Sequence, residues 1–265
     1  MIHDLNLEFV RIPEDEFIIG SVLKKDKLAQ PDEMPQHCLH VSDFYIMRFP
    51  VTNAQYYRFM QATGSPAPKF GWPEGRYPVE KADHPVVGVS YQDAVAFCKW
   101  ASIINGHALR LPTEPEWEKA ARGTDGRVYP WGDTWEAGYT NSQEAKLNGT
   151  TPVGQFSPQG DSPYGVAEMG GNVQEWCSSL FGRYPYDPAD GRETLVYSED
   201  PASLPNFRET GCIANAQAIE ASLDKSVVRG GSWREEKLKS RCAYRGWAAP
   251  LHRSDDTGFR CVYEP

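Results

Sequence analysis

The chain has 265 residues and a formal net charge of −9, with 40% hydrophobic and 24% charged residues. These values are ordinary for a folded protein, and they argue against global disorder and against a domain-wide basic face for nucleic acid. The 23 glycines and 21 prolines favour a loop-rich fold over long helices or a regular barrel. No secretory leader and no run of about 20 apolar residues is visible. We therefore expect a cytoplasmic protein with no nucleic-acid and no membrane partner.

Three segments near the start of the chain alternate or run apolar, as β-strands do. They are residues 7–12 (LEFVRI), 16–21 (EFIIGS) and 40–47 (HVSDFYIM). Three further strands are expected near the end, at residues 226–231 (SVVRGG), 241–245 (RCAYR) and 258–263 (GFRCVY).

Between these groups, three segments have the sequence pattern of capped helices. In each, Ser or Thr is followed three residues later by Gln, Asp or Glu, which is the pattern of a capping box. Apolar residues then recur on one face, and a glycine stands where the helix would end. The segments are residues 50–64 (PVTNAQYYRFMQATG), 89–106 (VSYQDAVAFCKWASIING) and 111–123 (LPTEPEWEKAARG).

Residues 128–226 consist mostly of Gly, Pro, Asn, Asp, Ser and aromatic residues. A long region of this kind inside a compact domain is usually functional or organised by a ligand. We find no solenoid-length repeat and no clean linker, so we expect one domain over residues 1–265, with an unusual insert at about 192–224.

Seven motifs in a fixed order carry a resemblance to a known family. They are PVTNAQYYRF, RLPTEPEWEKAARG, YPWGD, GGNVQEW, VVRGGSW, RCAYR and TGFRC. Together they resemble the formylglycine-generating-enzyme, or sulfatase-modifying-factor, domain family over about residues 9–262. The resemblance implies an α+β, C-type-lectin-like FGE-sulfatase fold, with about three helices, short twisted sheets and long irregular loops.

The resemblance leaves the activity open, because the family contains copper-dependent cysteine oxidases, iron-dependent sulfur-transfer oxygenases and non-catalytic binding modules. Its copper members use two cysteines soon after the GGS motif, where soft thiolates suit Cu(I). Here residues 234–240 read REEKLKS, and Glu235 stands where the first copper thiolate would be. We therefore expect neither copper nor formylglycine formation.

Iron ligands are not readable in this sequence. The iron-dependent members take their ligands from a helical partner domain, for which this chain has no room. His37 and His40 are three residues apart in an expected strand, so their side chains point to opposite faces. The other four histidines form no spaced cluster.

Calcium is the metal that the resemblance favours. Its first-choice site is Glu168, Gly170, Gly171, Val173 and Glu175, where carboxylates flank a Gly-Gly bend. Hard cations bind oxygen ligands, many of them backbone carbonyls, and glycines let the chain fold around an ion. A second, weaker site comprises Asn141, Ser142 and Glu144, because Ala145 stands where the family's carboxylate is expected.

The six cysteines include no CxxC pair, so a zinc ribbon or thioredoxin-type motif is not expected. The resemblance implies that Cys98 and Cys261 occupy positions that pair in secreted members. We expect them to be close together but reduced in a cytoplasm. Cys242 matches a family position whose partner is Ala121 here, so that bridge is lost.

The tail also predicts a ligand surface at the exposed end of the fold, since aromatic and arginine residues are typical interface anchors. Its candidates are Ser232, Trp233, Arg234, Glu235, Arg245, Trp247, His252 and Arg253. Our first hypothesis is a non-catalytic module that binds a protein or small-molecule ligand and is stabilised by calcium. A retroelement-diversified version is disfavoured, because Glu235, Glu236, Lys237 and Trp247 are not readily produced by adenine mutagenesis.

The alternative hypothesis is a metal-dependent oxidoreductase of altered chemistry. Its metal ligands would come from the insert, which contains Cys212, or from a partner chain. The ligand, the partner and the oligomeric state are not readable from the sequence.

Overall fold

The computed structural model describes residues 5–193 and 225–265. Within them lie three α-helices, α1 (Asn53–Thr63), α2 (Tyr91–Asn105) and α3 (Glu114–Arg122). All three expected capping boxes are present. Gly64 and Gly106 end α1 and α2 in the left-handed conformation, with φ of 73° and 81°. The helix predictions are therefore confirmed, because each depended only on residues within one or two turns of the helix ends.

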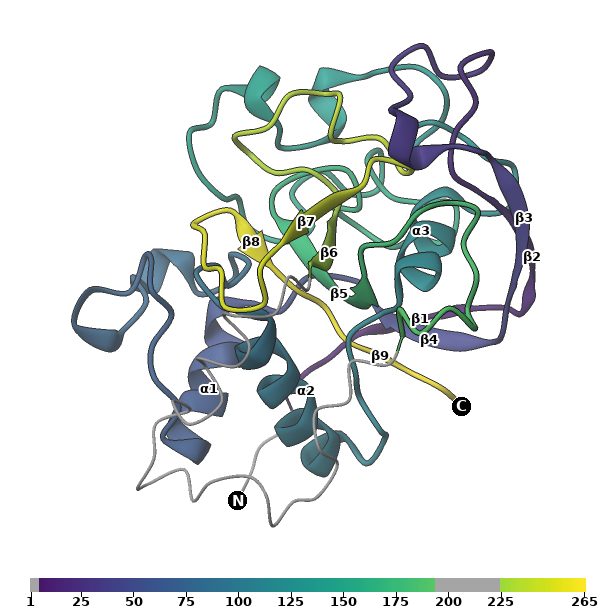
Figure 1. Cartoon of the computed structure of the whole chain (residues 1–265). Coiled ribbons are helices and arrows are strands. Elements are labelled where there is room, and N and C mark those ends of the chain that lie inside the picture. The colour runs from purple at the N-terminus through teal and green to yellow at the C-terminus, as the bar shows by residue number, and fades with distance from the viewer. Residues whose placement is uncertain (1–4, 194–224) are drawn as a thin grey trace.

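Among the described residues, the strands form three small sheets rather than one large one (Figure 1). The order in the first sheet is β1 (Phe9–Ile12), β4 (Phe44–Met47), β9 (Val262–Tyr263), and β2 (Asp15–Ile19) pairs with β3 (His37–Val41). The third sheet has the order β7 (Gly246–Ala248), β6 (Ser226–Arg229), β5 (Gln174–Leu180), β8 (Thr257–Gly258), with only β5 and β8 parallel. Short 3-10 turns are η1 (Pro31–Glu33), η2 (Pro73–Gly75), η3 (Val79–Lys81), η4 (Ala137–Tyr139) and η5 (Gln143–Ala145).

This arrangement is an α+β fold with long irregular loops, as expected, but three strand predictions need correction. Residues 40–47 do not form one strand, because the chain turns between β3 and β4. Residues 258–263 contribute to two different sheets, through β8 and β9. Residues 241–245 are not a strand, and β7 begins only at Gly246. There the side chains of Arg241 and Arg245 are held in buried ion pairs, which determine the backbone path.

Strand β5 was not expected from the sequence. Its residues are buried on both faces for most of its length, so it lacks the alternation of polar and apolar residues that marks a half-exposed strand. It is nevertheless the centre of the third sheet, between β6 and β8. The expected insert lies outside the described residues, apart from Arg192 and Glu193.

Two apolar clusters form the core. One joins α1 and α2 through aromatic rings, with Tyr56 stacked on Phe97 at 5.9 Å between ring centroids. The other packs Trp117 of α3 against Phe17 and Phe44 of the amino-terminal strands. In the described part of the chain, no helix is both long and apolar enough to cross a membrane.

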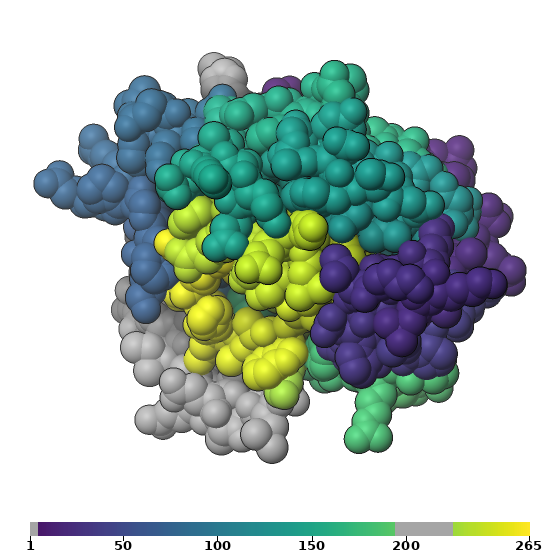
Figure 2. All heavy atoms as spheres, turned by 90° about the horizontal axis from the view of Figure 1, so that it is seen from above, coloured from purple at the N-terminus to yellow at the C-terminus, as the bar shows by residue number. Residues whose placement is uncertain are grey.

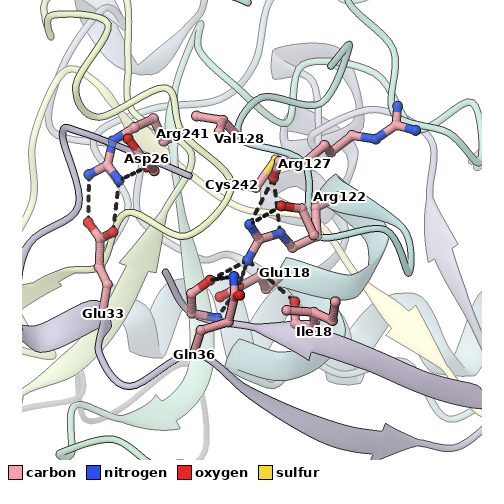
Figure 3. A network of polar contacts seen from close by, with 12 residues as sticks. Ile18, Asp26, Glu33, Gln36, Glu118, Arg122, Arg127, Val128, Arg241 and Cys242 are labelled. Carbon is pink, nitrogen blue, oxygen red and sulfur yellow. Dashed lines mark hydrogen bonds and ion pairs between the residues drawn. The ribbon is translucent and has the colours of Figure 1, made fainter. Parts of the chain in front are cut away.

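Buried ion pairs connect the end of the chain to this core. Arg229 contacts Glu114 and Glu118 of α3, and Arg260 binds Glu175 of β5 through both carboxylate oxygens. Figure 3 shows a neighbouring part of the network, where Arg241 binds Asp26 and Glu33 and Arg122 binds Glu118. Every one of these charges is compensated, which is the condition under which a buried ion is tolerated.

Candidate functional site

The candidate site follows β6, where two glycines turn the chain into a loop. We call residues 233–240 the tail loop. Gly230 and Gly231 have φ of 100° and 64°, a region that other residues rarely adopt. A Cβ atom on Gly230 would lie 2.9 Å from the Trp117 ring, so the backbone must approach that ring closely. In Figure 2 the yellow end of the chain occupies one face, between the purple amino-terminal segment and the teal middle of the chain.

At the base of the tail loop, Ser232 and Asp256 form a buried hydrogen-bonded pair. The Ser232 hydroxyl donates to Asp256 Oδ2 at 2.8 Å, and both residues are almost fully buried. Gln174 Nε2 donates to the same oxygen at 3.3 Å, and Ser254 donates to Asp256 Oδ1. These polar groups come from β5, from the turn after β6 and from the segment before β8. Together they form a cluster of hydrogen-bonded polar side chains next to the tail loop.

The tail loop itself adds charged and aromatic side chains to this polar cluster. Arg234 pairs with Asp255 at 2.6 Å and lies over the Trp233 ring, with its Cζ 4.7 Å from the centroid. Glu235 pairs with Lys239 at 2.8 Å. Burial lowers the pKa of Lys239, but its hydrogen bonds to Glu235 and Tyr244 and its attraction to these two groups together outweigh burial, so the net pKa is raised and the ammonium stays charged. An ion pair therefore stands where the resemblance placed the first copper thiolate.

The cysteines of the described residues do not replace that thiolate. Cys242 is fully buried, and burial raises the pKa of its thiol to about 12. Cys98 and Cys261 lie close together, as expected, with their Sγ atoms 3.3 Å apart, and burial raises the pKa of Cys261 well above its ordinary value. Cys38 is exposed but belongs to β3. Cys212, assigned to the insert, lies outside the described residues.

The expected ligand surface is only partly a surface. Trp233 and Arg253 are partly exposed, Arg234 and His252 are exposed, and 50% of Trp247 is exposed. Glu235 is half-buried in its ion pair. Ser232 and Arg245, by contrast, are buried at 0% and 3% exposure. Arg245 was placed on the surface wrongly, because its guanidinium is bound by both oxygens of Glu114.

The first expected calcium site contains a carboxylate without a cationic partner. Glu168 is buried and has a φ of 63°, which is unusual for a residue other than glycine. Its Oε1 accepts a hydrogen bond from the Gly154 amide, but its Oε2 has no partner. Burial raises the pKa of Glu168 to about 8. The other buried glutamates in the described part of the chain all pair with an arginine, namely Glu33, Glu114, Glu116, Glu118 and Glu175.

Other expected ligands of that site already accept hydrogen bonds from the protein. Both oxygens of Glu175 accept hydrogen bonds from Arg260, and Oε2 also accepts one from Trp117. The Gly170 carbonyl accepts from Thr140, and the Gly171 carbonyl accepts from the amide of Val173. Glu175 is thus committed to an arginine, whereas Glu168 is available to a cation.

The second expected calcium site has one free oxygen as well. Asn141 is buried, and its Oδ1 has no hydrogen-bond partner. Its Nδ2 donates to Asn172 Oδ1 at 3.2 Å, and Asn172 also interacts with Glu168. Asn172 therefore links the two regions. Glu144 is used differently: it accepts from the Ser142 hydroxyl at 2.8 Å and from the Lys237 amide at 2.9 Å, so it anchors the tail loop.

These contacts fit a hard cation more readily than a transition metal. The free groups are one carboxylate oxygen and one amide oxygen, which are calcium ligands. No group of three or more His, Cys, Asp or Glu side chains is close enough to hold a metal ion in the described ranges 5–193 and 225–265. Because affinity for calcium increases with the number of charged ligands, a site with one carboxylate would bind weakly.

Comparison with known proteins places these features in a family. Residues 4–265 match the model of the sulfatase-modifying factor enzyme 1-like domain. The chain is 31% identical to the formylglycine-generating enzyme of Mycobacterium tuberculosis, over 97% of this chain and 98% of that protein. It is also 30% identical to the hercynine oxygenase of Mycolicibacterium smegmatis and 32% identical to the serine/threonine-protein kinase pkn1 of Chlamydia pneumoniae. Each of these two matches covers 96% of this chain, but only 61% of the hercynine oxygenase and 38% of the kinase.

The solved structures agree with these sequence relatives. The structure of PvdO from Pseudomonas aeruginosa has a TM-score of 0.75 and 27% identity, covering 98% of this chain and 95% of that one. The crystal structure of CarF has a TM-score of 0.66 at 22% identity and so supports the fold alone. With the family model matching almost every residue, this chain belongs to the FGE-sulfatase, or sulfatase-modifying-factor, family.

Proposed function

We propose that this chain is a non-catalytic binding module of the family, formed by a single domain and stabilised by calcium. The observation that carries the proposal is the Glu235–Lys239 ion pair in the tail loop. Residues 234–240 contain no cysteine, and Cys242 just beyond them is buried and protonated. Formylglycine formation by copper needs accessible thiolates, whereas this loop offers fixed charges.

The ligand surface of the proposal is the exposed part of the tail. Trp233, Arg234, Trp247, His252 and Arg253 present aromatic faces and cations to solvent. The Arg234–Asp255 pair and the hydrogen bond from Trp233 Nε1 to the Asp255 carbonyl hold two of these side chains in place. Such partly ordered aromatic and arginine side chains lose little entropy on binding a protein or small-molecule ligand.

The proposed calcium ligands are Glu168 and Asn141, each of which has one buried side-chain oxygen without a hydrogen-bond partner. A bound calcium ion supplies positive charge that would compensate the Glu168 carboxylate. The residues around it keep the site rigid: Asn172 connects the two ligands, and the Gly154 amide orients the carboxylate.

The second candidate function is a metal-dependent oxidoreductase with altered chemistry. It is favoured by the buried polar groups next to the tail loop, where Ser232 and Gln174 both donate to the Asp256 carboxylate. It is also favoured by similarity to proteins named formylglycine-generating enzyme and hercynine oxygenase. In this version the metal ligands would come partly from the insert at about 192–224 or from a partner chain.

One experiment separates the two candidates. The purified full chain would be analysed for bound metals and assayed for oxygen consumption with cysteine-containing peptides and small thiols, with and without added Cu(I) or Fe(II). The binding-module proposal predicts no copper or iron, at most calcium, and no oxygen uptake above the rate of free metal. Bound copper or iron with turnover that is lost in Ser232→Ala would overturn it in favour of the oxidoreductase.

A further inference from the structure

A hollow on the molecule lies between two segments far apart in sequence. Pro31, Asp32 and Met34 form one wall, and Phe181, Gly182, Arg183 and Tyr184 form the other. The cavity has a volume of about 470 Å³, within the range of roughly 300–1,000 Å³ typical of small-molecule sites. Neither the calcium candidates nor the exposed tail residues line it.

Buried charges hold both walls in place. Arg245 donates to the Asp32 carbonyl at 2.9 Å on one wall and to the Gly182 carbonyl at 2.8 Å on the other. Its guanidinium lies over the rings of Phe181 and Tyr184, at 4.5 and 4.0 Å from their centroids. The same group is bound by Glu114, so it is fixed from behind.

Each wall also has an anchor of its own. On the first wall, Glu33 next to Asp32 forms a bidentate ion pair with the buried Arg241. On the second, the Arg192 guanidinium donates to the Arg183 carbonyl at 2.8 Å. The hollow is therefore preorganised, and a ligand would not have to order its walls on binding.

The lining contains apolar and aromatic side chains together with one acidic and one basic side chain. Pro31, Met34, Phe181 and Tyr184 supply apolar and aromatic surface. Asp32 stands on one wall and Arg183 on the other, both side chains are exposed, and neither forms an ion pair with another side chain in the part of the chain that the structure describes. A matching ligand carries a cation, an anion and an apolar group on a small frame.

We propose that this hollow binds a free α-amino acid with a large apolar side chain. Asp32 receives the α-ammonium group, Arg183 receives the α-carboxylate, and the side chain lies between Met34, Phe181 and Tyr184. An arginine is suited to the carboxylate, since its planar fork can donate two parallel hydrogen bonds. This site is independent of the tail surface, so the protein would carry it whether or not the tail binds a partner.

The test is isothermal titration of the full chain with L-phenylalanine and L-leucine. Three comparison compounds each lack one feature: 3-phenylpropionate has no ammonium, phenethylamine has no carboxylate and glycine has no apolar side chain. Saturable binding of the two amino acids, with each comparison compound at least about tenfold weaker, is the expected result. The absence of saturable binding by both amino acids would overturn the proposal.

Variants locate the site. Arg183→Gln and Asp32→Asn remove exposed charges that hold no buried partner, so both proteins should fold, and each should weaken L-phenylalanine at least about tenfold. Arg76→Gln is the matched control, an exposed arginine away from the hollow, and should bind like the wild type. Arg234→Gln alters the tail surface and should also leave this binding unchanged. If Arg183→Gln and Asp32→Asn bind like the wild type, the amino acid does not occupy this hollow.

Discussion

Charged side chains have opposite roles in two parts of the end of the chain, residues 226–265. Outside the tail loop, Arg229 and Arg260 are buried and bind glutamates of α3 and β5. In the tail loop, Arg234 and Glu235 form pairs that remain accessible to water. The difference shows that a charged motif cannot be assigned a role from composition. Buried charged side chains stabilise the fold through ion pairs, whereas exposed ones can bind a ligand or be substituted.

The largest expected effect comes from breaking a buried pair. Arg229→Met leaves Glu114 and Glu118 less compensated in the interior, and should lower the free energy of unfolding by about 3–5 kcal/mol. The matched control, Arg234→Met, removes an exposed pair from the same tail and should cost about 1 kcal/mol or less. Denaturant titration of both variants measures the contrast. Equal losses would mean that burial does not distinguish the two regions.

The second prediction concerns two buried thiols, Cys98 of α2 and Cys261 near the end of the chain. Diamide should take two electrons and two protons from Cys98 and Cys261 and leave a disulfide, because their sulfurs already lie 3.3 Å apart. The bridge would close a very long loop and should raise the stability by about 2–5 kcal/mol. Thermal melts before and after oxidation measure it, with Cys98→Ser as the unbridged control. No gain in the wild type relative to that control would exclude a bridge in the folded state.

The third prediction uses the buried glutamate that lacks an arginine. The pKa of Glu168 is raised to about 8, above its unfolded value, so the folded carboxyl keeps a proton that calcium must displace. Apparent calcium affinity should therefore increase with pH and level off above about pH 8. Without calcium the sign reverses: stability should fall as pH rises from about 4.5 to about 8, because the unfolded state gives up this proton while the folded state keeps it, and it should level off above about pH 8.

Calcium titrations followed by thermal melting at several pH values check this behaviour. Glu168→Gln keeps the shape of the side chain but cannot ionise, so its calcium response should be lost and its stability should vary less with pH. A wild-type response that is flat with pH, or one retained in Glu168→Gln, would place calcium elsewhere.

The smallest effect is expected in the tail loop. Glu235→Gln removes the pairing with Lys239 and should change the free energy of unfolding by about 1 kcal/mol or less, with the difference reduced in high salt. Denaturant titration at low and high ionic strength measures it. A loss comparable to that of Arg229→Met would show that the loop belongs to the scaffold after all.

Local signals in the sequence predicted the parts of the fold that depend on neighbours along the chain. The three capping boxes and their terminal glycines are confirmed, since each involves residues within a few positions of one another. Strand β5 was missed because a strand buried on both faces shows no alternation. Residues 241–245 were misassigned because buried ion pairs with Glu33 and Glu114 override local strand preference.

By itself, the sequence determined the family, the three helices and the loss of cysteines from the tail loop, since motif order and local spacing need no coordinates. Only the tertiary structure decided which charged side chains form buried ion pairs that stabilise the fold. Arg229 and Glu114 are 115 positions apart, and the walls of the hollow, at Asp32 and Arg183, are farther apart still. Whether a carboxylate such as Glu168 meets an arginine depends on packing between distant segments, because burial, not residue type, sets the cost of leaving it unpaired.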